Sequence, residues 1–439
     1  MMKTEVHEAY RRILQSEMIA AMGCTEPIAI AYAAAMARQV LGKKPEHCLV
    51  DCSGNIVKNV MGVTVPNSGG LKGIDVAAVL GILGGDAGRG LEVLEGVTPE
   101  QVEEAKQLLK QDYCECRLVP NVENLYLCLS VRAGEDSALV EIRNFHKNVT
   151  RIERNGDVLF ENDLACREVS EEEAKQADPD KALLNISDIL DFALSPEDSE
   201  MRELLEYQLS CNRAIAKEGL EKPYGAQVGR TLLPAEELTP ENVRYFAKAW
   251  AAAGSDARMN GCAMPVVINS GSGNQGITVS LPVELYAKAY GISHERMLQA
   301  LAISNLIAVH QKKYVGSLSA YCGAVSAACG AGAGISYLLG EDLSREALYE
   351  QICGTIINTI VTVGGMVCDG AKSSCAAKIA CAVDCAVTAW ELARKGHVFH
   401  SGEGLVMKDA ERTIEMVGRM AREGMRATDN EILKIMLGR

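Results

Sequence analysis

Apolar positions repeat at helical spacing along most of this chain, and one central stretch alternates like β-strands. EVHEAYRRILQSEMIAAM and IAIAYAAAMARQVLG predict two helices within residues 3–42, joined by GCTEP at 23–27. TPEQVEEAKQLLKQ opens with a Thr cap and a Pro in the first turn, which predicts a helix over 99–111. Residues 125–161 contain β-rich runs separated by two turn signals, Ala-Gly-Glu-Asp at 133–136 and Asn155-Gly156. This pattern predicts an antiparallel meander. We expect the 99–111 helix to pack on those strands.

From about residue 183 to the C-terminus, one helical pattern follows another. The predicted fold class is therefore α+β and mainly α-helical, with a small α/β subdomain. We place an N-terminal helical and loop part of the catalytic domain at 1–85, a small α/β insertion at 86–170, and a helical domain at 171–439. A charged link, EVSEEEAKQADPDKA, joins the insertion to the second helical part.

Composition and charge exclude several classes of partner. The chain has 439 residues and a net charge of −14, which argues against nucleic acid or an anionic membrane, since both need a positive surface. The charged N-terminus MMKTEVHEAYRR lacks the apolar core of a signal peptide. We expect a cytoplasmic enzyme with a small-molecule substrate, and a homodimer is the default assembly.

Residues 315–340 carry no charge over 26 positions, long enough to cross a bilayer. The stretch is dominated by Gly, Ala and Ser, which favours a buried helix packed through small residues over a membrane span. The chain also contains 16 cysteines. Without a mark of secretion, most of them are expected to be buried and free, and the rest are candidates for a metal site or a catalytic thiol.

Three loops rich in glycine and small polar residues are candidate anion sites: SGNIVKN at 53–59, PNSGG at 66–70 and SGSGNQG at 270–276. Glycine allows backbone N–H groups to approach an anion, and Ser and Asn add neutral donors. None of the three matches a phosphate-binding or dinucleotide-binding fingerprint, so ordinary turns explain them as well.

The cysteine spacing in the C-terminal half is more specific. Cys322 lies in SAYCGAV, and Cys368 and Cys375 flank the loop residues DGAKSS. Thiolates in such loops can surround iron or zinc. His310 ends an apolar helix nearby, where a structural role is the commoner reading. Lys312, Lys313 and Lys372 could each hold a pyridoxal Schiff base, although none has a supporting signature.

Taken in order, GCTEP, SGN, VPNSG, SGSGNQGI, YVGSLSAYCGAV, GGMVCDGAKSSCAAK and the closing GRMAREGM resemble the cysteine desulfidase family. That family is similar to the α domain of iron–sulfur-dependent L-serine dehydratases, and the motifs cover nearly the whole chain. The resemblance implies a lyase with an oxygen-sensitive [4Fe–4S] cluster. Cys322, Cys368 and Cys375 match its three ligands best, although a shifted alignment would exchange Cys322 for Cys329. The fourth iron would stay open.

The implied reaction is α,β-elimination from L-cysteine, giving pyruvate, ammonia and hydrogen sulfide, as a step of amino-acid catabolism. Cys24 is the candidate base, since a helix N-terminus favours a thiolate; whether it is instead a ligand stays open. His310 is a second candidate for proton transfer. Implied substrate-binding residues are Thr25, Glu26, Ser53, Asn55, Asn67, Ser68, Gly69, Ser272, Gly273, Asn274 and Gln275.

Three alternatives to cysteine desulfidation stay open. The same scaffold could act as an L-serine dehydratase or on another β-substituted amino acid. The chain could also be a non-enzymatic metal or cluster protein, or a pyridoxal phosphate lyase without iron.

Overall fold

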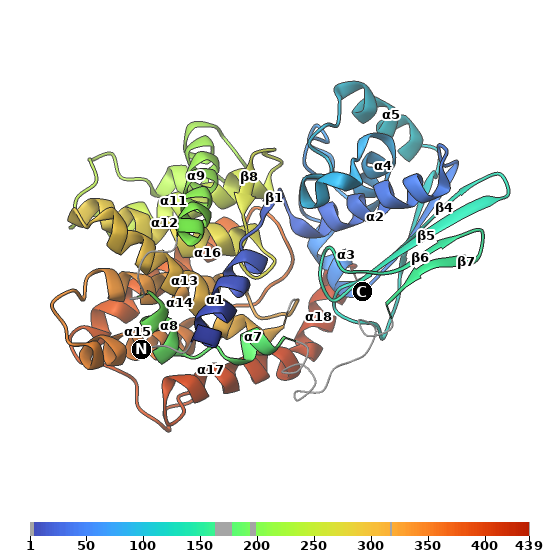
Figure 1. Cartoon of the computed structure of the whole chain (residues 1–439). Coiled ribbons are helices and arrows are strands. Elements are labelled where there is room, and N and C mark those ends of the chain that lie inside the picture. Colours follow the sequence, from blue (N-terminus) through green and yellow to red (C-terminus); the bar gives the residue numbers. More distant parts are fainter. Residues whose placement is uncertain (1–3, 163–177, 194–198, 317, 439) are drawn as a thin grey trace.

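The computed structural model describes residues 4–162, 178–193, 199–316 and 318–438. Two lobes lie side by side in Figure 1: a helical body, and a smaller lobe in which helices cover a six-stranded sheet. The expected fold class, mainly α-helical with a small α/β part, is confirmed.

The sheet has the strand order β3-β2-β4-β5-β6-β7. Strands β2 and β3 are parallel, and every other neighbouring pair is antiparallel. The predicted meander is therefore present as four consecutive strands, with Asn155-Gly156 at positive φ in the last hairpin. The strands are β2 (His47–Cys52), β3 (Cys114–Leu118), β4 (Tyr126–Ala133), β5 (Asp136–Arg143), β6 (Val149–Arg154) and β7 (Asp157–Glu161).

Helix α2 (Thr25–Leu41) packs on strands β4 and β5, and α4 (Ile74–Gly84) packs on α2. The predicted helix at 99–111 forms as α5 (Pro99–Leu109), with the capping box of Thr98 and Gln101. Its main contact is α4, so the expectation that it packs on the strands is wrong. The helix that covers the sheet is the one that starts at GCTEP, which fixes this motif at the boundary between the lobes. The 3-10 segment η1 (Ala87–Glu92) follows α4.

The domain boundary expected at residue 86 runs through a single sheet, because β2 pairs with both β3 and β4. Sequence-distant strands form one sheet here, and composition changes along the chain do not reveal such pairing. The boundary expected at 170, with most of the charged link, lies outside the described residues.

The helical body is built around α14, which packs against α12, α13, α15 and α16. Helix α14 coincides with the uncharged stretch, and small residues allow its neighbours to approach on all sides. Among the described residues, no helix is both long and apolar enough to cross a membrane. The helices of this body are α1 (Thr4–Glu17), α7 (Pro179–Ala182), α8 (Ile186–Ala193), α9 (Ser199–Glu221), α10 (Val228–Leu232), α11 (Val243–Met259), α12 (Gly273–Tyr290), α13 (His294–Val315), α14 (Gly323–Leu338), α15 (Arg345–Val363), α16 (Cys375–Ala393) and α17 (Ala410–Arg419).

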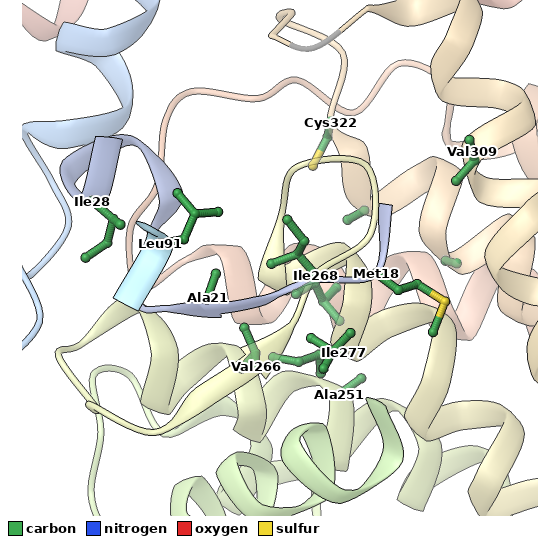
Figure 2. Close-up of a cluster of buried hydrophobic side chains, with 14 of the residues drawn as sticks. Met18, Ala21, Ile28, Leu91, Ala251, Val266, Ile268, Ile277, Val309 and Cys322 are labelled. Atoms are coloured by element: carbon green, nitrogen blue, oxygen red, sulfur yellow. The ribbon is translucent and has the colours of Figure 1, made fainter. Parts of the chain in front are cut away.

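A two-stranded antiparallel sheet ties the N-terminal segment to this body. Strand β1 (Ala20–Met22) pairs with β8 (Pro265–Val267), so the chain leaves α1 and enters α2 along the start of the SGSGNQG loop. Figure 2 shows Ala21 and Val266 of these strands in one apolar cluster with Ile268, Ile277 and Ala251. The sequence pattern predicted neither strand, because each has only three residues.

The C-terminal segment crosses from the helical body to the sheet lobe. After α17, the π-helical turn η3 (Met420–Gly424) leads into α18 (Arg426–Met436), which packs on α3 (Gly54–Val60). In Figure 1 the C-terminus accordingly lies beside α3 and the sheet, whereas the described N-terminus lies on the helical body.

Candidate active site

A pocket of about 110 Å³, partly open to solvent, lies where four helices begin. Cys24 precedes α2, Ser272 precedes α12, Cys322 precedes α14, and Cys375 is the first residue of α16; all four residues line the pocket. Helix N-termini carry partial positive charge and free N–H groups. The pocket is thus suited to anions although the chain as a whole is acidic.

The three cysteines predicted as cluster ligands all line this pocket. Cys322 N donates to Met366 O at 3.1 Å and Cys368 N donates to Ala320 O at 2.6 Å, so two short antiparallel segments hold these cysteines next to each other. Burial raises the pKa of the Cys322 thiol to about 12, and the nearby Cys368 and Cys375 contribute to the increase. Grouped buried thiols favour a partner that accepts their negative charge.

Cys329 lies elsewhere in the structure. It is fully buried within α14, where its Sγ lies 3.9 Å from Ile356 O, and it does not line the pocket. Of the two alternatives for the first ligand, the structure places Cys322 with Cys368 and Cys375.

The GCTEP motif lines the same pocket, and Cys24 shares a small apolar cluster with Cys375. Gly23 has φ +53°, and a Cβ there would lie 2.2 Å from Pro66 Cγ, so this position requires glycine. Cys24 occupies the N-cap of α2, as predicted, and its Sγ donates to Glu26 Oε2 at 2.9 Å. Thr25 Oγ1 donates to Gly271 O at 3.0 Å, which ties the motif to the SGSGNQG loop.

The expected preference of Cys24 for the thiolate form is wrong. Burial raises the pKa of the Cys24 thiol well above its usual value, the charge of Glu26 raises it further, and Arg258 only partly opposes them. Desolvation and a neighbouring carboxylate therefore outweigh the helix N-terminus.

Glu26 is the buried acid of the pocket. Burial opposes its ionisation, but His146 and the Cys24 thiol outweigh this effect and lower the Glu26 pKa to about 2. His146 Nε2 lies 3.7 Å from Glu26 Oε1 and comes from the loop between β5 and β6, so the sheet lobe also contributes to the pocket.

The SGSGNQG loop supplies Ser272, Asn274 and Gln275 to the pocket. Asn274 Oδ1 and Gln275 Oε1 are buried and have no hydrogen-bond partner among the described residues. Gly273 does not line the pocket, because it lies under Arg258: a Cβ there would be 2.4 Å from Arg258 Nε. The loop therefore combines unpaired polar groups with a close approach by a buried cation.

The remaining predicted residues lie outside the pocket lining. Ser53 caps α3 and donates to Asn124 O at 2.7 Å, Asn67 Nδ2 donates to Leu94 O at 2.9 Å, and Ser68 Oγ donates to Leu71 O at 3.1 Å. Asn55 and Gly69 do not line the pocket either; in this region Asn59 does. His310 is fully buried and pairs with Glu411 at 2.7 Å between Nε2 and Oε2, also outside the lining.

Two cations, Arg258 and Lys378, were missed as site residues; they line the pocket together with Lys312, which the sequence offered only as a Schiff-base candidate. Lys378 pairs with Asp369. Burial lowers the pKa of Lys312, which lies near the Cys368 and Cys322 thiols. Arg258 interrupts the small apolar residues of AAAGSDARM, and a charge on the buried side of a helix is the signal that could have found it.

The donor set suits a cluster better than a single ion. Within the described ranges, no three His, Cys, Asp or Glu side chains are close enough together to bind one metal ion. A [4Fe–4S] cluster is wider, since each cysteine binds a different iron atom, and thiolates are its usual ligands. Three cysteines around one pocket, facing Lys312, fit that larger group.

The family is shown by comparison with known proteins. The profile described as serine dehydratase alpha chain matches residues 88–434. This chain belongs to the serine dehydratase alpha chain family. The match includes the SGSGNQG loop and all three pocket cysteines of the C-terminal half, whereas the GCTEP motif lies before it.

Bacterial relatives align along nearly the full length of the chain. A UPF0597 protein of Lachnoclostridium phytofermentans is 50% identical over 425 residues, which are 97% of this chain and 98% of that protein. UPF0597 proteins of Treponema denticola and Fusobacterium nucleatum are 42% and 41% identical, over 98% and 99% of this chain and 98% and 100% of theirs. These names state no reaction, so the reaction class comes from the family, which is that of serine dehydratase-like lyases of amino-acid catabolism.

Proposed function

We propose that this protein is an L-cysteine desulfidase, a lyase that eliminates sulfide from L-cysteine and yields pyruvate and ammonia. The observation that carries the proposal is the meeting of Cys322, Cys368 and Cys375 with Cys24 in one pocket. The serine dehydratase family supports the reaction class, because loss of water from serine and of hydrogen sulfide from cysteine are the same α,β-elimination. We further propose a cytoplasmic location and a homodimer.

In this proposal Cys322, Cys368 and Cys375 hold a [4Fe–4S] cluster. When bound, the cluster supplies an iron atom without a protein ligand, a Lewis acid with affinity for the sulfur leaving group. Lys312 lies near two of the cysteines and would compensate the negative charge of their thiolates.

The side chains of the GCTEP motif would handle the proton. As a thiolate, formed by loss of its proton to solvent, Cys24 would remove the proton from Cα, and the carboxylate of Glu26, 2.9 Å away, would accept the hydrogen bond of the resulting thiol. The raised pKa of Cys24 reduces the amount of thiolate but makes that thiolate a stronger base, which suits a weakly acidic C–H bond. The Cα–H and Cβ–S bonds break, and the resulting enamine tautomerises and hydrolyses to pyruvate and ammonia.

L-Serine is the second candidate substrate, because the family name states it. Sulfide and pyruvate should be measured with both amino acids under anaerobic conditions, after reconstitution with iron and sulfide. We expect both products from cysteine at a higher kcat/KM than pyruvate from serine. Pyruvate from serine without sulfide from cysteine would refute the desulfidase proposal and leave a serine dehydratase.

The same anaerobically reconstituted protein also tests two other functions, a non-enzymatic metal or cluster protein and a pyridoxal phosphate lyase. A protein that only binds a metal or cluster would contain iron but give no pyruvate from either amino acid. A pyridoxal phosphate lyase would be active without iron or acid-labile sulfide. Iron and sulfide analysis beside the activity assay therefore separates all three.

A further inference from the structure

Arg258 is a buried cation that forms no ion pair with any residue the structure describes. Its side chain is 2% exposed, and it forms no hydrogen bond with those residues either. Nε in particular is buried and unpaired. Burying a guanidinium in this state is costly, because its hydration is lost and no hydrogen bond from the described residues replaces it. Such a group at the wall of a pocket indicates an anionic ligand.

The surroundings of Arg258 define where that anion would lie. Its nearest charged or ionisable neighbours are Cys24, Glu26 and Cys375, and Gly273 lets its Nε reach the start of α12. The backbone N–H groups of Gly273, Asn274 and Gln275 have no acceptor among the described residues. A fork of guanidinium donors beside free N–H groups matches the two oxygens of a carboxylate.

The other half of the same wall has the opposite polarity. Glu26 holds a carboxylate with a pKa of about 2, and the unpaired oxygens of Asn274 and Gln275 lie in the same pocket. These groups accept hydrogen bonds and suit an ammonium group. The wall therefore presents a cationic and an anionic contact together, which is the charge pattern of a zwitterion.

We propose that Arg258 and the N-terminus of α12 bind the α-carboxylate of the substrate, while Glu26 faces its α-ammonium group. This inference rests on the proposed lyase function and narrows its substrates to α-amino acids with a free carboxylate. With both α-substituents held by these groups, the side chain of the substrate would be left free to reach Cys322 and Cys368 in the same pocket. Lys312 lies near Cys322 and Cys368, so its charge acts on these thiols and not on the substrate carboxylate.

Binding without turnover tests the proposal independently of the reaction. L-Alanine has no leaving group, and L-alaninamide differs from it only by losing the carboxylate charge. Calorimetric titration of the anaerobically reconstituted wild-type protein is expected to give about tenfold to a hundredfold tighter binding of L-alanine than of L-alaninamide. Equal binding of the two, or binding of neither, would overturn the proposal without any variant.

Variants then assign the effect to this side chain. Arg258→Gln should weaken L-alanine binding to the L-alaninamide level and leave L-alaninamide binding and iron content unchanged, and Arg258→Lys should recover part of the loss. Arg230→Gln, which removes an exposed arginine of α10, is the charge-matched control and should bind like wild type. If Arg258→Gln still distinguishes L-alanine from L-alaninamide, the assignment is wrong.

Failure of the proposed reaction remains distinguishable from failure of this inference. A wild-type protein that eliminates neither cysteine nor serine refutes the lyase, whereas the L-alanine and L-alaninamide titrations still decide the role of Arg258. In an active enzyme, Arg258→Gln should raise KM for cysteine more than it lowers kcat.

Discussion

Replacing Lys58 by Met tests how the C-terminal helix supports the cysteine pocket. Lys58 lies in α3, and its side chain is 1% exposed. Its Nζ pairs with Asp429 of α18 and also donates to Cys368 O at 3.2 Å. One buried ammonium group therefore connects the C-terminal helix to the loop that carries a predicted cluster ligand.

The expected loss of stability follows from the unpaired groups that remain. Removing one partner of a buried ion pair costs about 3–5 kcal/mol, because the other charge stays buried alone. Asp429 is 11% exposed, which places Lys58→Met near the lower end of that range. The Cys368 carbonyl also loses a donor, at about 1 kcal/mol. We therefore expect a loss of about 4 kcal/mol in the free energy of unfolding.

Urea unfolding followed by circular dichroism measures this loss. Lys58→Met and Asp429→Leu should each destabilise the protein, and the double variant should lose less than the sum, because it leaves no buried charge. Lys44→Met breaks the exposed pair with Glu104 and is the matched control, with an expected loss below about 1 kcal/mol. Strictly additive losses would refute the coupling of Lys58 and Asp429. Iron content should drop in Lys58→Met and not in Lys44→Met.

Three further predictions concern the cysteines and a buried acid. Cys322→Ser should lose most iron after reconstitution, whereas Cys329→Ser should retain it; the reverse iron contents would exchange the two ligands. Cys24→Ser should keep its iron and lose elimination by about 10²- to 10⁴-fold, and loss of iron instead would make Cys24 a ligand. Burial raises the pKa of Asp256 to about 6 from 3.8, so its ionisation in the folded state costs about 3 kcal/mol. The free energy of unfolding should therefore decrease as the pH rises from about 4 to about 6. In Asp256→Asn, the urea midpoint should no longer decrease over this pH range. The same decrease in both proteins would contradict the assignment to Asp256.

Local motifs were the part of this site that could be predicted from the sequence. GCTEP and the segments around Cys322, Cys368 and Cys375 carry their cap, turn and ligand chemistry within a few residues. Arg258 and His146 reach the pocket from α11 and from a β-loop, and only tertiary packing brings them to Cys24.

The residues that were predicted in the site but lie outside the pocket lining have a related explanation. A loop rich in Gly, Ser and Asn has the same composition whether it binds a ligand or forms a turn, and Asn67 and Ser68 are used for the turn. His310 pairs with Glu411, which lies 101 positions later, so the residues around His310 in the sequence do not indicate its partner.

The position of the pocket along the chain also sets the order of biosynthesis. Its walls come from residues 24–26, from Asn59, from His146, from 258–275 and from 312–379. The last of these segments leaves the ribosome only after most of the chain has been made, and α18 follows it. The pocket where the four helices begin is therefore completed later in synthesis than the strands of the sheet lobe, which end at Glu161. Cys322, Cys368 and Cys375 can therefore hold a shared cofactor only after the chain has been synthesised beyond residue 375.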